Sequence, residues 1–261
     1  MKPTILIYDS GMGGLTIYDE IRKKIPNAYY IYCFDNAYFP YSEKSESELV
    51  ARAEHIVQKI IKKHPLDLVV VACNTASTVV LPTLRKKFDI EVVGTVPAIK
   101  PAAQISQTKT IGLLATKGTV NRRYVQELID SYAKECVVEK IGSTTLVELA
   151  EQKMQTNTVD SEKLQEIIAT WQSNPKLDTV ILGCTHFPVV KKELQQLLPQ
   201  VKNFIDSGKA IANRVEFLLK TKKIAEKSSF DNIAYCTKVT KNIKDQENIM
   251  IKNGLKRLDF I

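Results

Sequence analysis

Two of the five cysteines stand where an apolar run gives way to polar residues. Cys73 follows the apolar run 68–72, and Cys184 follows the run 179–183. We expect each to precede a helix, whose N-terminal dipole favours the thiolate form of a cysteine and so allows acid/base chemistry. A free cysteine inside a core is instead a small inert hydrophobe. That interpretation suits the other three cysteines: Cys33, Cys136 and Cys236.

The two cysteines belong to a weak internal repeat. The segments 66–75 (LDLVVVACNT) and 177–186 (LDTVILGCTH) both contain Leu-Asp, an apolar run, a small residue and then cysteine with a polar neighbour. Upstream, 4–10 (TILIYDS) and 110–116 (TIGLLAT) each end in a hydroxyl residue before a glycine-containing turn. The first residue of each upstream segment precedes its cysteine by 69 and 74 residues, respectively. The repeat predicts two related halves, each presenting a hydroxyl-bearing loop and a cysteine.

Duplicated thiols suit one kind of reaction better than others. Inversion of a stereocentre needs one group that removes a proton and a second group that delivers a proton to the opposite face. A single nucleophilic cysteine would instead need a histidine base and one site only. The pair Cys73 and Cys184 therefore favours a proton-transfer reaction that is nearly its own mirror image.

The glycine-rich turn 9–14 (DSGMGG) has two other interpretations. A dinucleotide fingerprint G-x-G-x-x-G would need glycine at position 16, which is Thr16, and the chain has no G-x-x-x-x-G-K-[ST] motif. A tight turn from strand to helix is the ordinary interpretation, and its backbone N–H groups can bind a carboxylate. The turn therefore favours carboxylate binding over nucleotide binding.

Short apolar runs alternate with helical patterns, as in parallel α/β sheets. The predicted strands are 4–8, 29–34, 68–72, 91–95, 110–115, 137–141 and 179–183. The clearest amphipathic helices are 46–62, preceded by a capping box of Ser45 and Glu48, and 160–171. Ligands of parallel sheets bind at the carboxyl ends of the strands, where both cysteines would lie.

These observations predict two pseudo-symmetric parallel-sheet α/β domains with the active site in the cleft between them. Boundaries are expected at the proline-bearing stretch 97–101 (PAIKP) and at 206–208 (DSG). The first domain would comprise 1–96 and 208–261, and the second 97–207. The stretch 228–261 carries no motif and receives no role.

The composition excludes several classes of protein. Apolar residues make up 44% and charged residues 25% of the chain, as in globular proteins, and no run approaches a membrane span of about 20 residues. The N-terminus lacks the pattern of a signal peptide, so we expect a cytoplasmic protein. The net charge is +8, but lysines are spread along the helices, and the dense stretch after Lys220 also carries acidic residues. We therefore expect neither a nucleic-acid partner nor a membrane partner.

Cysteine and histidine spacings argue against disulfides and metals. The number of cysteines is odd, and no two form a CxxC pair. His55 falls in a helical pattern and His64 lies just before Pro65, and both are expected in solvent. The three histidines, His55, His64 and His186, do not form a ligand cluster. No metal site is predicted.

Four motifs in order carry a resemblance to a known family. DSGMGGLT (9–16), FDNAYFPYS (34–42), VACNTAST (71–78) and LGCTHFP (182–188) together resemble glutamate racemases, over residues 4 to about 215. The resemblance implies an isomerase that needs no cofactor and interconverts L- and D-glutamate by two-base proton transfer. It also implies two pseudo-symmetric α/β domains and a supply of D-glutamate for peptidoglycan synthesis, and it allows a homodimer.

The resemblance also implies roles for particular residues. Cys73 and Cys184 would be the proton carriers, with Cys73 deprotonating D-glutamate and Cys184 deprotonating L-glutamate. Asp9 would assist Cys73, His186 would assist Cys184, and Glu151 falls at an acidic position near the site. Substrate contacts would come from Ser10, Tyr41, Ser42, Asn74, Thr75, Thr116, Thr119 and Thr185.

Two departures from the family pattern and two rival functions remain. The common Pro-Tyr-Gly is Pro-Tyr-Ser here, which matters little if Ser42 acts through its backbone N–H, and the segment 142–151 differs from the commoner version. The nearest rival is an aspartate racemase or a related decarboxylase, but His186 resembles the glutamate enzymes, where the aspartate enzymes have glutamate. A rival from another class is an α/β protein that binds nucleotides or nucleic acids.

Overall fold

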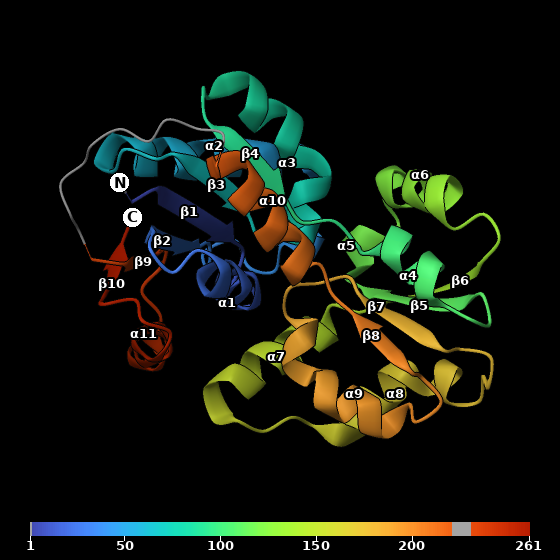
Figure 1. Cartoon of the computed structure of the whole chain (residues 1–261). Coiled ribbons are helices and arrows are strands. Elements are labelled where there is room, and N and C mark those ends of the chain that lie inside the picture. Colours follow the sequence, from blue (N-terminus) through green and yellow to red (C-terminus); the bar gives the residue numbers. More distant parts are fainter. Residues whose placement is uncertain (1, 221–230) are drawn as a thin grey trace. The chain divides into compact units, whose positions relative to one another are not determined.

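The computed structural model describes residues 2–220 and 231–261, which fall into two compact units (Figure 1). Unit 1 contains the chain up to Thr95 and from Gly208 onward, and unit 2 is Val96–Ser207. The stretch 221–230, part of the lysine-dense segment, lies outside the described residues. None of the described helices is long and apolar enough to cross a membrane.

The described part of unit 1 contains a parallel sheet in the order β10-β9-β2-β1-β3-β4. Its strands are β1 (Thr4–Asp9), β2 (Tyr29–Phe34), β3 (Leu68–Val71), β4 (Glu91–Gly94), β9 (Ile233–Cys236) and β10 (Leu258–Phe260). All residues of β1 and β3 are buried, because helices cover both faces of the sheet. The continuous apolar runs that predicted these strands reflect this two-sided burial.

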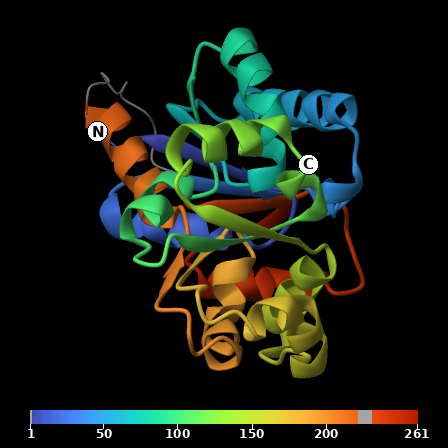
Figure 2. The same cartoon turned by 90° about the vertical axis from the view of Figure 1, so that its right-hand side faces the viewer.

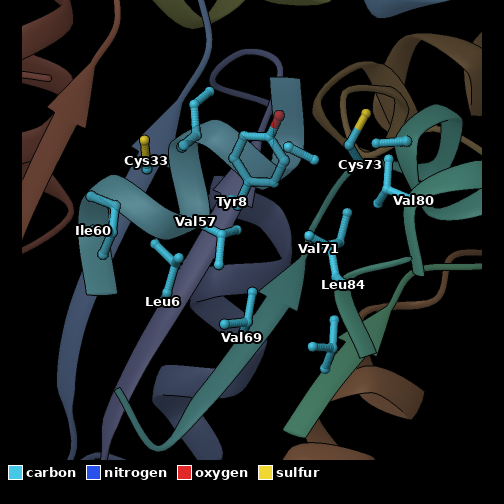
Figure 3. Close-up of a cluster of buried hydrophobic side chains, with 14 of the residues drawn as sticks. Leu6, Tyr8, Cys33, Val57, Ile60, Val69, Val71, Cys73, Val80 and Leu84 are labelled. Carbon is cyan, nitrogen blue, oxygen red and sulfur yellow. The ribbon is translucent and has the colours of Figure 1, made fainter. Parts of the chain in front are cut away.

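Helices on each face of this sheet are held by alternate side chains of the strands. They are α1 (Leu15–Lys24), α2 (Glu46–Lys63), α3 (Asn74–Lys87), α10 (Gly208–Lys220) and α11 (Ile243–Lys252), with a 3₁₀ turn η1 (Tyr41–Glu43). Leu6 and Val69 belong to a core cluster with the buried faces of α2 and α3 (Figure 3). On the opposite face, Tyr18 of α1 packs edge-on against Tyr30, with ring centroids 5.2 Å apart. The predicted capping box of α2 is present, with Ser45 and Glu48 bonded reciprocally.

Unit 2 contains a parallel sheet in the order β6-β5-β7-β8. Its strands are β5 (Thr110–Ala115), β6 (Val137–Gly142), β7 (Thr179–Leu182) and β8 (Asn203–Ile205). Its helices are α4 (Ile99–Ile105), α5 (Lys117–Val120), α6 (Arg123–Tyr132), α7 (Thr145–Thr156), α8 (Ser161–Gln172) and α9 (Lys191–Leu197), with a 3₁₀ turn η2 (Phe187–Val190). Figure 2 shows α4 and α6 on one side of the sheet and α7, α8 and α9 on the other.

The two sheets share a strand order, as the internal repeat predicts. The order β2-β1-β3-β4 of unit 1 corresponds to β6-β5-β7-β8 of unit 2. In both sheets the chain leaves the first strand toward one edge and then crosses to the other edge, so the carboxyl ends of β1 and β3, and of β5 and β7, are topological switch points. Cys73 follows β3, and Cys184 follows β7 after one glycine. Each cysteine therefore lies at the ligand-binding position of its own sheet.

One repeat position differs for a packing reason. Leu6 of β1 packs toward α2, whereas the matching residue of β5 is Gly112. A Cβ on Gly112 would lie 2.8 Å from the ring of Trp171, which comes from α8. The large indole of Trp171 therefore occupies the space that a leucine side chain fills in unit 1.

Three strands were not predicted: β8, β9 and β10. β8 and β10 have only three residues each, too few for a periodic pattern to identify, and β9 lies in the stretch 228–261, which carries no motif. Residues of β9 pair with β2, from Ile31 opposite Ile233 to Phe34 opposite Cys236. The chain after Gly208 thus completes the sheet of unit 1.

Candidate active site

Cys73 occupies the junction between β3 and α3. It is the N-cap residue of α3, and its carbonyl oxygen accepts the N–H of Ser77, so the predicted helix after Cys73 is confirmed. The thiol donates to Ser10 Oγ over 3.7 Å and is 5% exposed. Figure 3 shows this thiol at the end of the core cluster, beyond Val71. A sulfur at a helix N-terminus lies where negative charge is stabilised.

Asp9 ends β1 and organises the glycine-rich turn. Its buried carboxylate accepts the backbone N–H of Ser10 at 2.7 Å and that of Gly14 at 2.5 Å. A Cβ on Gly14 would lie 2.9 Å from atoms of Asp9, so this close approach needs glycine. Two N–H groups of the turn therefore bind the chain's own carboxylate and are not offered to a ligand. Through Ser10, Asp9 is connected to Cys73.

The remaining candidates of unit 1 lie in η1 and at the start of α3. Tyr41 lies in η1, is buried, and donates its hydroxyl to Asp35 Oδ2 over 2.7 Å. Ser42 is half-buried in the same turn, and Asn74 and Thr75 begin α3 as buried polar residues. Within residues 2–220 and 231–261, the buried Nδ2 of Asn74 has no hydrogen-bond acceptor. A buried amide donor without an acceptor costs about 1–3 kcal/mol, which a ligand carboxylate would offset.

The second group of candidates centres on Cys184. Its sulfur lies 3.8 Å from Nδ1 of His186, and Nε2 of His186 lies 3.4 Å from Glu151 Oε1. Cys184 and His186 are buried, and Glu151 comes from α7. Burial disfavours the charged imidazolium, but hydrogen bonds with Cys184 and Glu151 outweigh this effect and hold the pKa of His186 well above its usual range. A protonated His186 stabilises negative charge on the neighbouring sulfur.

Three threonines lie at the same edge of the sheet as Cys184. Thr116 follows β5, the neighbour of β7, and its hydroxyl caps α5 by accepting the N–H of Thr119 at 3.2 Å. The hydroxyls of Thr116 and Thr119 are 2.9 Å apart. Thr185 follows Cys184 and is buried. Buried hydroxyls at this strand edge can donate to a bound carboxylate.

Cys184 precedes a 3₁₀ turn, and not an α-helix as Cys73 does. In unit 1 the carbonyl of Cys73 accepts the N–H four residues later, as in an α-helix. The corresponding residue in unit 2 is Pro188, which has no N–H, so the carbonyl of Cys184 accepts the N–H of Phe187 at 3.1 Å. The turn η2 results, and α9 begins only at Lys191. Cys184 therefore has an imidazole as its nearest electrostatic partner, and Cys73 has a helix N-terminus.

The other cysteines match their prediction with one exception. Cys33 and Cys236 are buried, and burial raises the pKa of both thiols. Cys136 is half-buried, not buried, because it precedes β6 at the edge of its sheet. These environments favour protonated, unreactive thiols at Cys33 and Cys236.

The remaining histidines belong to neither group of candidates. His55 is exposed on α2, as expected. His64 was expected in solvent, but it is half-buried and its Nε2 lies 2.8 Å from the hydroxyl of Tyr235, because β9 completes the sheet beside it. Across the described residues, no cluster of three or more histidine, cysteine, aspartate or glutamate side chains could hold a metal ion.

Comparison with known proteins decides the family. The model of the Asp/Glu/hydantoin racemases matches residues 14–215. The chain belongs to this family. A glutamate racemase of Actinobacillus pleuropneumoniae serotype 3 (strain JL03) is 67% identical over 262 residues, with 100% of this chain and 99% of the relative covered. The chain is thus an amino-acid racemase, an isomerase.

Solved structures of the family have the same fold. The structure of Escherichia coli glutamate racemase, in complex with L-glutamate and the activator UDP-MurNAc-Ala, matches with a TM-score of 0.97 at 48% identity. The alignment covers 100% of this racemase and 98% of that chain. A glutamate racemase of Bacillus anthracis matches with a TM-score of 0.81 at 25% identity, covering 99% and 96% of the two chains.

Three contacts of this racemase were not predicted from the sequence. Asp35 joins Tyr41 to Arg52 and Thr237. Asp35 itself could have been identified from the sequence, because it lies inside the motif 34–42 and directly after a predicted strand. Nothing in the sequence indicated that Arg52 and Thr237 bind Asp35, because only folding brings them to it.

The raised pKa of His186 predicts a pH-dependent stability. Because the folded-state pKa lies above the unfolded value of about 6.5, protonated His186 stabilises the fold fully below that pH. This contribution is lost as pH rises through the folded-state pKa. We therefore expect His186→Gln to lower the free energy of unfolding most near pH 6, and the difference from the unsubstituted protein to shrink as the pH rises into the alkaline range.

Urea unfolding at several pH values measures this difference. His55→Gln, on the exposed face of α2, is the control for loss of an imidazole and should change the free energy of unfolding by less than about 0.5 kcal/mol. A difference for His186→Gln that grows with pH would show that His186 is neutral in the folded protein.

Proposed function

We propose that this racemase interconverts L- and D-glutamate by proton transfer at Cα between the thiols of Cys73 and Cys184. The observation that carries the proposal is the equivalent placement of the two cysteines, each at the switch point of one of two sheets with the same strand order. Support for glutamate as substrate comes from the relatives named glutamate racemase. It also comes from His186, which follows the pattern of the glutamate enzymes.

The proton balance of the reaction needs one thiolate and one thiol at the start. With D-glutamate, the Cys73 thiolate takes the α-proton and becomes a thiol. The Cys184 thiol gives its proton to the opposite face of Cα, which leaves L-glutamate and a Cys184 thiolate. With L-glutamate the two sulfurs exchange roles. The proposal requires that Cα of the bound substrate reach both sulfurs. We expect this of two domains, 1–96 with 208–261 and 97–207, whose active site would lie in the cleft between them.

The site must also stabilise the charge that develops at Cα. The substrate α-carboxylate can take up this charge only if fixed donors surround it. Candidate donors are the amide of Asn74 and the hydroxyls of Ser10, Thr75, Thr116, Thr119 and Thr185, with further contacts from Tyr41 and Ser42. We propose no cofactor for this step, because donors and two thiols balance every proton and charge.

Three acidic or basic residues complete the proposal. His186, held by Glu151, stabilises the thiolate of Cys184 through its contact at 3.8 Å. Asp9 acts on Cys73 by fixing Ser10, which accepts from the thiol. D-Glutamate made in this way would supply peptidoglycan synthesis and so support cell shape.

Racemisation by the dialysed protein tests the proposal. Extensively dialysed enzyme is incubated with L-glutamate, and the loss of circular dichroism is followed together with chiral chromatography of the product. We expect a racemic mixture without added pyridoxal phosphate or metal, and a rate with L-aspartate lower by about 100-fold or more. Comparable rates with aspartate would assign the chain to the aspartate enzymes, and a requirement for pyridoxal phosphate would contradict two-thiol chemistry.

A further inference from the structure

Asp35 is a buried carboxylate that the reaction described above does not use. It follows β2 directly and is 0% exposed. Arg52 of α2 binds it with two hydrogen bonds, from Nε to Oδ2 and from Nη2 to Oδ1, both at 2.8 Å. Thr237 donates its hydroxyl to Oδ1 at 2.5 Å. A two-bond arginine–carboxylate pair fixes the orientation of both groups.

The fourth donor to Asp35 is the candidate substrate-contacting residue Tyr41. Its hydroxyl donates to Oδ2 at 2.7 Å and also contacts the hydroxyl of Tyr8. Because Tyr41 gives its one O–H proton to Asp35, its hydroxyl does not donate a hydrogen bond to a substrate in this arrangement. The backbone N–H of Asp35 in addition donates to the carbonyl of Asp9 at 2.9 Å. Asp35 thus connects the turn η1 with the residue that organises the first loop of the site.

Thr237 brings the C-terminal segment into this arrangement. It directly follows β9, which pairs with β2, and it is 8% exposed. Its hydroxyl also accepts the N–H of Ala37 at 3.1 Å, which anchors the chain between β2 and η1. The segment 231–261, for which the sequence predicted no role, therefore contributes a hydroxyl that holds Asp35.

We infer that Asp35, held by Arg52 and Thr237, is a positioning residue that sets the substrate-contacting segment Tyr41–Ser42 for glutamate binding. The inference rests on the proposed function. Asp35 does not touch reacting atoms in this scheme. It acts through Tyr41, so its loss weakens binding of substrate and of the transition state alike.

The position of Arg52 explains how the arrangement stays rigid. The side chain of Arg52 is 19% exposed, and its guanidinium lies 4.4 Å from the ring centroid of Tyr38. Tyr38 and Arg52 therefore cover the buried carboxylate from the solvent side, while Tyr41 and Thr237 bind it from within. Removing one neutral donor leaves the charged pair intact, which makes Thr237 the residue to change.

The test compares three threonine variants by steady-state kinetics in both directions. Thr237→Val removes the hydroxyl that binds Asp35, and Thr237→Ser keeps it. Thr179→Val is the matched control, because the Thr179 side chain is also buried and also hydrogen-bonds an aspartate, Asp178, but at the amino end of β7. We expect Thr237→Val to raise KM for L- and D-glutamate by about 10-fold with kcat within about 3-fold, as for a loss of uniform binding.

The conservative variant and the control make the outcome decisive. Thr237→Ser should restore KM to within about 2-fold, and Thr179→Val should lower the urea midpoint without raising KM. An unchanged KM in Thr237→Val, or an equal KM rise in Thr179→Val, would overturn the positioning role. The unsubstituted enzyme is assayed alongside, so a failure of the proposed function appears as absent racemisation in every sample.

Discussion

Replacement of either Cys73 or Cys184 by alanine is expected to abolish racemisation in both directions. In the proposed mechanism each sulfur is the base in one direction and the acid in the other, so neither direction would survive the loss of one thiol. The expected fall in kcat/KM is about 10³-fold or more, since both general acid/base assistance and the proton itself are lost. Initial rates from L- and from D-glutamate, followed by circular dichroism, measure it.

Matched variants separate chemistry from folding. Cys136→Ala removes a half-buried thiol outside both groups of candidates and should retain full activity. Cys33→Ala removes a thiol from the core and should lower stability while activity of the folded protein persists. A Cys184→Ala enzyme with near-normal activity, folded by its urea midpoint, would refute the two-thiol mechanism.

The strands that carry the site could be predicted because each is buried on both faces. The runs directly before Asp9 and Cys73, and their counterparts directly before Thr116 and Cys184, read as continuous apolar segments. The same signal is absent from β8, which has three residues.

Several contacts of the candidate site could not be predicted from the sequence, for different reasons. The resemblance predicts that Glu151 lies near the site, but only the fold brings it to His186, 35 residues away in the sequence. Thr237 is 202 residues from Asp35, and the link depends on β9, which no periodicity predicted. The unequal surroundings of Cys73 and Cys184 come from His186, where unit 1 has Thr75, and from Pro188, whose missing N–H prevents an α-helix from starting there.

That inequality leads to a prediction about the two helpers, Asp9 and His186. L- and D-glutamate are mirror images, so their equilibrium constant in solution is one, and kcat/KM must be equal in the two directions for every variant. Racemisation rates therefore cannot show which sulfur a helper serves. A one-base partial reaction can, because deprotonation of a glutamate analogue with a leaving group at Cβ ends in elimination without reprotonation.

We expect Asp9→Asn to slow elimination mainly from the D-analogue and His186→Asn mainly from the L-analogue, each by about 10²–10⁴-fold. His186 touches the sulfur of Cys184 directly, and its substitution removes the cation that favours that thiolate. Asparagine at position 9 keeps only one oxygen to accept the N–H groups of Ser10 and Gly14, so the hydroxyl that meets Cys73 shifts. Product release is followed by absorbance for each enantiomer, with Cys136→Ala as the unaffected control. Equal losses from both enantiomers in both variants would mean that Asp9 and His186 orient the substrate instead of serving separate sulfurs.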